Sequence, residues 1–453
     1  MIQLNEEFFE NITSDKLDFL DGLIKPYLNH KQQLYNRYSR KANTNDTMGA
    51  YTDRIIVAFE YYIVNMAKGY LAGLEPKYTV KDSDNMESYQ ESIDFIRRYN
   101  DDAATFIELM HDYLITTSAY LYIYENEENE IVYTRFDSLQ TVVIYDYGTP
   151  PYPVASVRKW IESDPNGTKI EVMEIVTKNE RVTYKNGNKH GESEIMLWGD
   201  IPITSFENPD GIAIFEPALD KIDAYENLVT NIKSMTQYND TAKLMLRGYM
   251  FMSPDMESED RRKEEERIYK SKCLQVDADG DVKWLLKNID YGGILDVLKQ
   301  LHDLITMLTG VPNMTDQAFS NADNASALGY KLYALDQYSA TADRVFKKGY
   351  LRLWEIITNR LNLKGNSYNF RDIDIAFNRN IPTDKDKSID RAVKALNSQL
   401  ISLETAINIS GIEVDADSEI ERIRAERQDD YTTIQNKHVE DVVDDEKPIL
   451  EIS

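Results

Sequence analysis

The chain has 453 residues, enough for about two to four structural units. Its 78 acidic and 51 basic side chains give a formal net charge of −27, which excludes a protein that wraps nucleic acid tightly, since that binding needs Lys and Arg to neutralise phosphates. A single cysteine, Cys273, excludes a disulfide framework within the chain and a thiolate zinc cluster.

The first part of the chain is predicted to be helical. Residues 1–48 contain a weak helical period and a linker, and three stronger helical patterns cover residues 50–78, 85–99 and 103–118. Pro76 ends the first of these patterns. The basic run at residues 31–41 predicts a solvated face, with a nucleic-acid or partner contact as the alternative.

The period then changes from helical to alternating. Strands are predicted at residues 120–124, 131–136, 141–145, 154–160, 169–176, 181–184 and 201–206. Asn186 and Gly187 form a good hairpin turn, because both residues accept a positive φ. The first half is therefore α+β.

A long helix is predicted at residues 216–247, with Pro217 at its start. The next segment, residues 248–288, differs in character because it combines a dense charge run at residues 257–267 with short strand-like pieces. An insertion of this kind between two long helices indicates a small protruding subdomain.

A second pair of helices follows. In residues 291–310 the apolar side chains share one face, and Gly310 and Pro312 end the pattern; those side chains are Ile294, Leu298, Leu301, Ile305 and Leu308. After a polar loop at residues 311–325, a helical pattern of about 38 residues would span roughly 57 Å. Gly329 and Gly349 are candidate kinks in it. The simplest alternative is a pair of core helices in an ordinary helical domain.

The last part returns to short elements. A strand is predicted at residues 372–377, and helices at residues 387–399, 403–409 and 418–435. Residues 412–453 hold 14 acidic and 5 basic side chains, a balance of −9, and the end of the chain is predicted to be a disordered tail.

The sequence contains no motif of a nucleotide cradle, a zinc helix or a nucleophile elbow. Its five histidines are scattered singly, and Cys273 has no apparent catalytic partner. The runs Asp277–Asp281 and Asp415–Glu419 imitate calcium loops, but Val282 and Ile420 stand where the sharp turn needs Gly. We therefore expect no enzyme activity, no metal and no cofactor. The acidic first residues predict no secretory signal, and no apolar run is long enough for a membrane span.

Seven segments, taken in order, resemble the portal proteins of tailed double-stranded-DNA bacteriophages with long non-contractile tails and Gram-positive hosts. They are RIIVAFEYYIVNMAKGYLAGLEPKY (54–78), ITTSAYLYIYEN (115–126), VVIYD (142–146), the Ile-Pro and Phe-x-Asn of 201–208, FEPALDKIDAYENLVTNI (215–232), FSNADNASALGYKLYALD (319–336) and SLETAINISGIEVDADSEIERIRAE (402–426). Each is weak alone, and their order carries the resemblance. Residues 324–327 (Asn-Ala-Ser-Ala) depart from the family, which often has Ser-Gly there.

The resemblance implies an α+β portal fold, assembled as a ring of about twelve subunits around a channel. It assigns residues 1–214 to a wing, 215–247 and 290–310 to stem helices, 248–289 to a clip, 311–325 to a tunnel loop, 326–383 to a long wing helix and strand, 384–435 to a crown and 436–453 to an acidic tail.

The implied location is the portal vertex of the capsid in the virion, after assembly in the host cytoplasm. The implied partners are the terminase large subunit, a head–tail adaptor, the major capsid and scaffolding proteins, and double-stranded DNA that passes without sequence specificity. No membrane partner is expected.

Three sets of side chains are candidates for these contacts. The tunnel loop offers Asn313, Thr315, Asp316, Gln317, Asn321, Asp323 and Asn324, which can touch the DNA backbone weakly. The channel wall offers Asp296, Lys299 and Asp303, and the clip offers Arg261, Arg262 and Lys263. Two other classes stay open: an acidic helical adaptor without a channel, and a cytosolic enzyme with an unadvertised carboxylate site.

Overall fold

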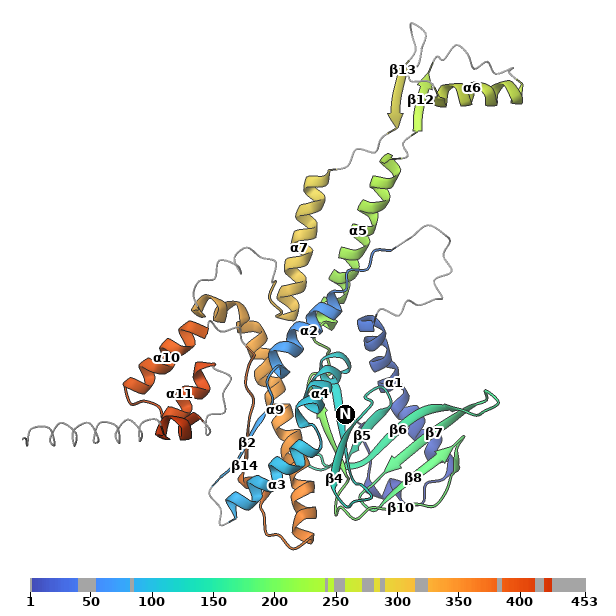
Figure 1. Cartoon of the computed structure of the whole chain (residues 1–453). Coiled ribbons are helices and arrows are strands. Elements are labelled where there is room, and N and C mark those ends of the chain that lie inside the picture. The colour runs from blue at the N-terminus through green and yellow to red at the C-terminus, as the bar shows by residue number, and fades with distance from the viewer. Residues whose placement is uncertain are drawn as a thin grey trace, which may run out of the picture. The chain divides into compact units, whose positions relative to one another are not determined.

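The computed structural model describes residues 2–39, 54–81, 85–240, 243–247, 257–270, 281–285, 290–313, 325–380, 385–411 and 419–425 (Figure 1). The chain divides into two compact units, residues 1–380 and 381–453. Helices and sheets are both extensive, so the predicted α+β class is confirmed.

The helices of the first unit agree with most of the predicted ones. They are α1 (Ser14–Ser39), α2 (Phe59–Ala72), α3 (Met86–Tyr99), α4 (Asp102–Thr116), α5 (Leu219–Asp240), α6 (Ser258–Lys270), α7 (Tyr291–Thr309) and α9 (Ala325–Leu363), with short 3-10 turns at Glu6–Phe9, Glu216–Ala218 and Phe370–Asp372. The long helix predicted at residues 326–363 is thus confirmed as α9, 39 residues in length.

Within the described residues, the larger sheet has seven strands in the order β1, β5, β6, β7, β8, β10, and β9 also pairs with β8. Their bounds are β1 (Ile2–Gln3), β5 (Thr141–Tyr145), β6 (Pro153–Ser163), β7 (Lys169–Val176), β8 (Glu180–Lys185), β9 (Asn188–Lys189) and β10 (Glu194–Ile195). β1 pairs with β5 in parallel, and the other neighbours are antiparallel. The predicted turn at Asn186 and Gly187 is confirmed, since both residues have positive φ between β8 and β9.

The other sheets are smaller. A three-stranded antiparallel sheet has the order β11 (Ile203–Glu207), β3 (Ser118–Glu125), β4 (Ile131–Phe136). Two further antiparallel pairs join strands far apart in sequence: β2 (Lys77–Val80) with β14 (Ile373–Ala376), and β12 (Lys243–Arg247) with β13 (Asp281–Leu285).

The main hydrophobic core forms around α9, which packs against β11. Phe346, Tyr350 and Trp354 are spaced four residues apart, so they lie on one face of α9, and all three are fully buried. Gly349 lies on the same helix, and a Cβ there would come within 2.4 Å of the Phe206 ring. Gly349 therefore permits close packing of α9 on β11, and the helix continues through it.

The two faces of the larger sheet pack against different partners. Alternation along β5 directs Val142 and Ile144 into a cluster with Leu20 and Ile24 of α1. Val143 and Tyr145 belong instead to a cluster shared with the three-stranded sheet, which includes Tyr120, Tyr122 and Phe136. The sheet is therefore covered on both sides.

Two predicted helices have wrong bounds. The pattern over residues 50–78 gives a helix only from Phe59 to Ala72, and the described residues before it are not helical. The helix predicted at residues 216–247 ends at Asp240, and Lys243–Arg247 is a strand. In both places contacts with distant segments override the local period.

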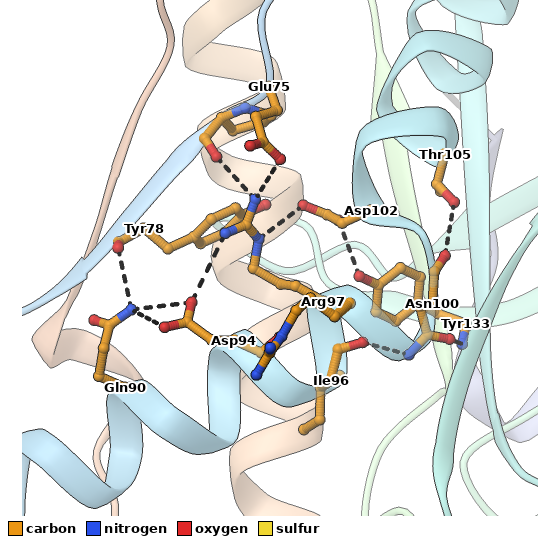
Figure 2. Close-up of polar contacts among 12 residues, drawn as sticks. Glu75, Tyr78, Gln90, Asp94, Ile96, Arg97, Asn100, Asp102, Thr105 and Tyr133 are labelled. Atoms are coloured by element: carbon orange, nitrogen blue, oxygen red, sulfur yellow. Dashed lines mark hydrogen bonds and ion pairs between the residues drawn. The ribbon is translucent and has the colours of Figure 1, made fainter. Parts of the chain in front are cut away.

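Arg97 anchors a polar cluster that fastens α3 to α4 and to the start of β2 (Figure 2). Its guanidinium pairs with Asp102 at 3.1 Å and Glu75 at 3.2 Å, and lies 4.3 Å from the ring centroid of Tyr78. Asp102 is buried and also accepts a hydrogen bond of 2.9 Å from Tyr133. Burial raises the pKa of Asp102, and the charge of Arg97 opposes that rise.

The second unit contains α10 (Lys385–Asn397) and α11 (Leu403–Ser410), which pack together, and residues 419–425, which are helical. Ser402 caps α11 by accepting a hydrogen bond from the Thr405 amide. The helices predicted at residues 387–399 and 403–409 are confirmed, and the helix predicted at 418–435 is described only at 419–425. The whole predicted acidic tail, residues 436–453, lies outside the described residues.

Candidate functional site: the α5–α7 helix pair and its connections

α5 and α7 lie side by side and run in opposite directions (Figure 1). The ends of α7 match the prediction because its stop and start signals are local. Asp290 caps the start by accepting a hydrogen bond of 3.1 Å from the Gly293 amide, and Gly310 ends the helix with a left-handed φ of 68°.

Much of α7 is exposed. Ile305 and Thr309 are buried, but Leu295 is 62% and Met307 is 67% exposed. Leu308 shares the predicted apolar face with Ile305 by its spacing, but it is 40% exposed. The helix carries more apolar surface than the described residues cover.

The exposed side of α7 has two distinct stripes. Asp296 and Asp303 are seven residues apart and share a face, and Lys299 lies nearby; all three are exposed. Val297, Leu304 and Leu308 form an apolar flank, also exposed, about 100° further around the helix. Asp296, Lys299 and Asp303 thus occupy a solvent-facing side, as a channel wall requires, and their role stays a prediction.

A short extended segment ties α2 to α5. The amide of Ile55 donates to the Thr230 hydroxyl, and the amide of Val57 donates to the Glu226 carboxylate, both at 3.0 Å. Arg54 pairs with the same carboxylate at 3.2 Å. Because Glu226 is fully buried and serves both groups, it fixes this segment along α5.

The basic run at residues 31–41 is not a solvated face in the part described. Arg37 pairs with Glu60 at 3.0 Å and with Asp223 of α5 at 2.9 Å. Lys31 is buried, and its ammonium donates to the Tyr120 hydroxyl and the Thr141 carbonyl, each at 3.0 Å. Lys31 and Arg37 therefore make internal contacts, each with a segment that is distant in sequence.

Burial lowers the pKa of Lys31 to about 8, although the negative charges of Glu207, Asp112 and Asp137 oppose the shift. The sequence signal for this buried lysine is slight. Lys31 lies seven residues after Ile24 and eleven after Leu20, which places it on the buried stripe of α1. Helical spacing therefore identifies Lys31 as internal, whereas the local charge count does not.

The start of the polar loop is firmly held. Val311 and Pro312 are buried, and the Tyr62 hydroxyl of α2 donates to the Pro312 carbonyl at 3.0 Å. The Asn313 amide lies 3.3 Å from Nδ1 of His302 on α7. Of the loop side chains predicted to contact DNA, only Asn313 is described. The others lie outside the described residues: Thr315, Asp316, Gln317, Asn321, Asp323 and Asn324.

The insertion between α5 and α7 contains the β12–β13 pair and α6. The charge run forms α6, and Arg261, Arg262 and Lys263 are exposed on it. Lys263 makes an exposed contact of 3.6 Å with Asp260, three residues earlier. Such a pair is worth little, so the helix presents its charge to solvent.

The part of the chain that the structure describes has no group of His, Cys, Asp and Glu arranged to hold a metal ion. Nor is any helix there long and apolar enough to cross a membrane. Of the two calcium-like runs, only Asp281 and Glu419 are described.

The comparison with protein families decides the identity. A family model described as phage portal protein, SPP1 Gp6-like, matches residues 21–432. The chain belongs to this portal protein family. No curated protein matches the sequence. A chain from a solved structure described as the neck of an empty GTA particle, computed with C6 symmetry, is 13% identical at a TM-score of 0.46, over 77% of this chain and 89% of that chain.

The portal family confirms the predicted resemblance and the portal fold. It makes the chain a structural component of a phage particle, part of the head–tail connection. The division into wing, stem, clip, tunnel loop and crown stays a prediction, as do the roles of the individual site residues.

Proposed function

We propose that this portal protein assembles into a ring of about twelve subunits at one vertex of the capsid, and that double-stranded DNA enters and leaves through its channel. The match over residues 21–432 carries the proposal. In this arrangement α5 and α7 are the stem helices, residues 1–214 and 326–383 the wing, 248–289 the clip and 384–435 the crown.

The two exposed stripes of α7 support a ring. The apolar flank of α7 is 39–46% exposed, so it gains free energy when another surface covers it. A neighbouring copy covers Val297, Leu304 and Leu308 in a closed ring, where the same contact repeats at every subunit. The face carrying Asp296 and Asp303 is left for the channel.

The negative charge of the chain supports a channel through which DNA slides, and not a surface that binds DNA tightly. A wall lined by carboxylates repels phosphates, so DNA slides along it and does not gain the counterion release that tight binding requires. Lys299 offers one weak positive contact per subunit. This wall works without regard to base sequence, because nothing on it is arranged to read base edges.

The insertion is the proposed docking site for the terminase large subunit during packaging, and later for the head–tail adaptor. Its exposed charges suit a salt-sensitive contact that can dissociate. Such a contact allows one partner to be exchanged for the other. The motor's ATP hydrolysis resides in the terminase, and we assign no catalysis to the portal chain. Scaffolding and major capsid proteins meet the ring at the vertex, inside the assembling virion.

Mass and shape test the ring directly. We expect native mass spectrometry to show a species of about twelve copies, and negative-stain images to show a central hole. Monomers or dimers across a range of salt and protein concentrations contradict the proposal.

The tunnel loop is tested by replacing Asn313, Gln317 and Asn321 with Ala. These amides hydrogen-bond phosphate oxygens weakly, so their loss removes many small contacts around the ring. We expect normal rings and normal empty capsids, with less DNA packaged or retained. Capsids that fill and hold DNA at the normal level would show that the loop is only a connector.

A further inference from the structure

The outer side of α3 breaks the amphipathic pattern of the helix. Tyr89, Ile93 and Ile96 are buried on the inner side, as a surface helix requires. Phe95 and Tyr99 lie beside this buried stripe, on a flank of the helix, and are 49% and 44% exposed. Their rings stack on each other with centroids 6.0 Å apart. An ordered aromatic pair facing solvent is typical of a contact surface.

A groove of about 310 Å³ opens beside these rings, between α3, the end of α9 and the start of β4. We name it the α3 groove. Its floor is apolar and consists of Phe95, Ile96, Ile131 and Leu361. Glu91 and Glu130 stand among the polar side chains that line it. The volume lies near the lower end of the range for ligand pockets, about 300–1,000 Å³, and suits one or two large apolar side chains.

The charges around the α3 groove are unbalanced. Lys364 is the cation in its lining, and it is already engaged: its ammonium lies 3.0 Å from the Glu125 carboxylate and donates to the Asn129 carbonyl at 2.8 Å. Glu91 and Glu130 make no ion pair with any described residue. An apolar floor beside two uncompensated carboxylates therefore faces solvent.

We propose that the α3 groove docks a basic amphipathic segment of another protein. An aliphatic or aromatic side chain of that segment fills the floor, and Lys or Arg residues close to it in sequence pair with Glu91 and Glu130. The complementarity of charge selects this occupant over an acidic one. Residues 426–453 of the chain itself carry a strong acidic excess, so their charge does not match that of Glu91 and Glu130.

The proposal is independent of the DNA channel, because it uses none of the side chains of α5, α6 or α7. It gives this portal protein a second contact surface, on helices that the channel function does not explain. Two side chains of the groove are already held in place, because Phe95 stacks on Tyr99 and Lys364 contacts Glu125 and Asn129.

Fluorescence anisotropy with the full-length protein tests this assignment. The probe is a fluorescein-labelled amphipathic peptide of leucine and lysine, compared with a leucine and glutamate peptide of the same pattern. We expect the basic peptide to bind, more weakly as salt rises, and the acidic peptide not to bind. Phe95→Ser and the double variant Glu91→Gln/Glu130→Gln each weaken binding by about tenfold or more.

Matched variants separate the groove from the general acidity of the chain. Phe95→Leu keeps an apolar anchor and retains most of the affinity. Glu108→Gln/Glu192→Gln removes the same charge from two exposed carboxylates elsewhere and changes binding by less than about twofold. Circular dichroism confirms that each variant is folded. The proposal is overturned if the basic peptide fails to bind, if Phe95→Ser binds normally, or if the two double variants weaken binding equally.

Discussion

The core around α9 buries its apolar side chains within the chain, whereas the α5–α7 pair leaves several of its own exposed to solvent. On α9, Phe346, Tyr350 and Trp354 are fully buried within the chain. On α7, Leu295 and Met307 are mostly exposed, and the flank of Val297, Leu304 and Leu308 is 39–46% exposed. The core is thus complete in one copy of the protein, whereas the helix pair leaves apolar surface exposed, which the proposed ring would cover. Stability and assembly are therefore separable by mutation.

The largest expected effect is on assembly. The triple variant Val297→Ser/Leu304→Ser/Leu308→Ser removes the apolar flank, which contributes several kcal/mol at every subunit contact when buried. We expect native mass spectrometry to show loss of the ring, with an unfolding midpoint close to that of dissociated wild-type protein. Asp296→Asn/Asp303→Asn is the control and leaves the ring intact. A ring that survives the triple change would show that another surface joins the subunits.

The next effect is on the stability of the α9 core. Arg97→Leu leaves the buried Asp102 carboxylate without its cation, which costs about 3–5 kcal/mol in the free energy of unfolding. Burial already raises the pKa of Asp102, and the loss of Arg97 raises it further, so protonation relieves the penalty. Stability lost near pH 7 should therefore partly return at a lower pH.

Urea unfolding at the two pH values measures this change. Arg97→Leu/Asp102→Asn is the matched control, because it removes both charges and should recover much of the loss at neutral pH. If Arg97→Leu is as stable as the wild type at neutral pH, solvent must reach the Asp102 carboxylate.

A smaller effect concerns Lys31. Its pKa falls from 10.5 to about 8 on folding, so the buried cation destabilises the fold below pH 8, and the penalty fades as the pH rises towards 10.5. Relative to Lys31→Met, the wild type should gain on the order of 2 kcal/mol between about pH 7 and pH 10. Chemical unfolding at both pH values measures the difference. Lys25→Met, on the exposed side of α1, should show no such pH dependence.

The smallest effect is on docking. Reversing Arg261, Arg262 and Lys263 to Glu changes neither core nor helix pair, so stability and assembly should hold. Binding of the motor, measured by surface plasmon resonance, should weaken by about tenfold, or 1.4 kcal/mol. Unchanged motor binding would place the contact elsewhere on the ring.

The comparison also shows where sequence reasoning succeeds. The bounds of α7 coincide with local signals, the Asp290 cap and Gly310, and the strands β4, β5 and β7 follow from alternation. The failures are contacts with distant segments. Arg54 and Val57 fit a helical pattern but are not helical, because they bind Glu226. Residues Lys243–Arg247 also fit a helical pattern, but they form a strand that pairs with Asp281–Leu285.

The candidate site is less predictable than the fold. The spacing of Asp296 and Asp303 places them on one exposed face, which the structure shows. The charge of a residue does not identify its partner. The run of basic residues therefore does not predict the contacts that Lys31 and Arg37 make with distant segments. Exposure of Phe95 within an otherwise regular helix also appears only in three dimensions.

The parallel pairing of β1 with β5 has a consequence for the order of folding. The Gln3 side chain donates to the Asp146 carbonyl, a contact that closes a separation of 143 residues. The ribosome makes β1 early, but its partner strand emerges only after α1 to α4 and β3 and β4 have been synthesised. Closing so long a loop is slow, so β1 should dock late, and the sheet edge beside β5 should remain open during synthesis. An open strand edge invites pairing with another chain, which makes this the stage at which nascent copies are most prone to aggregate.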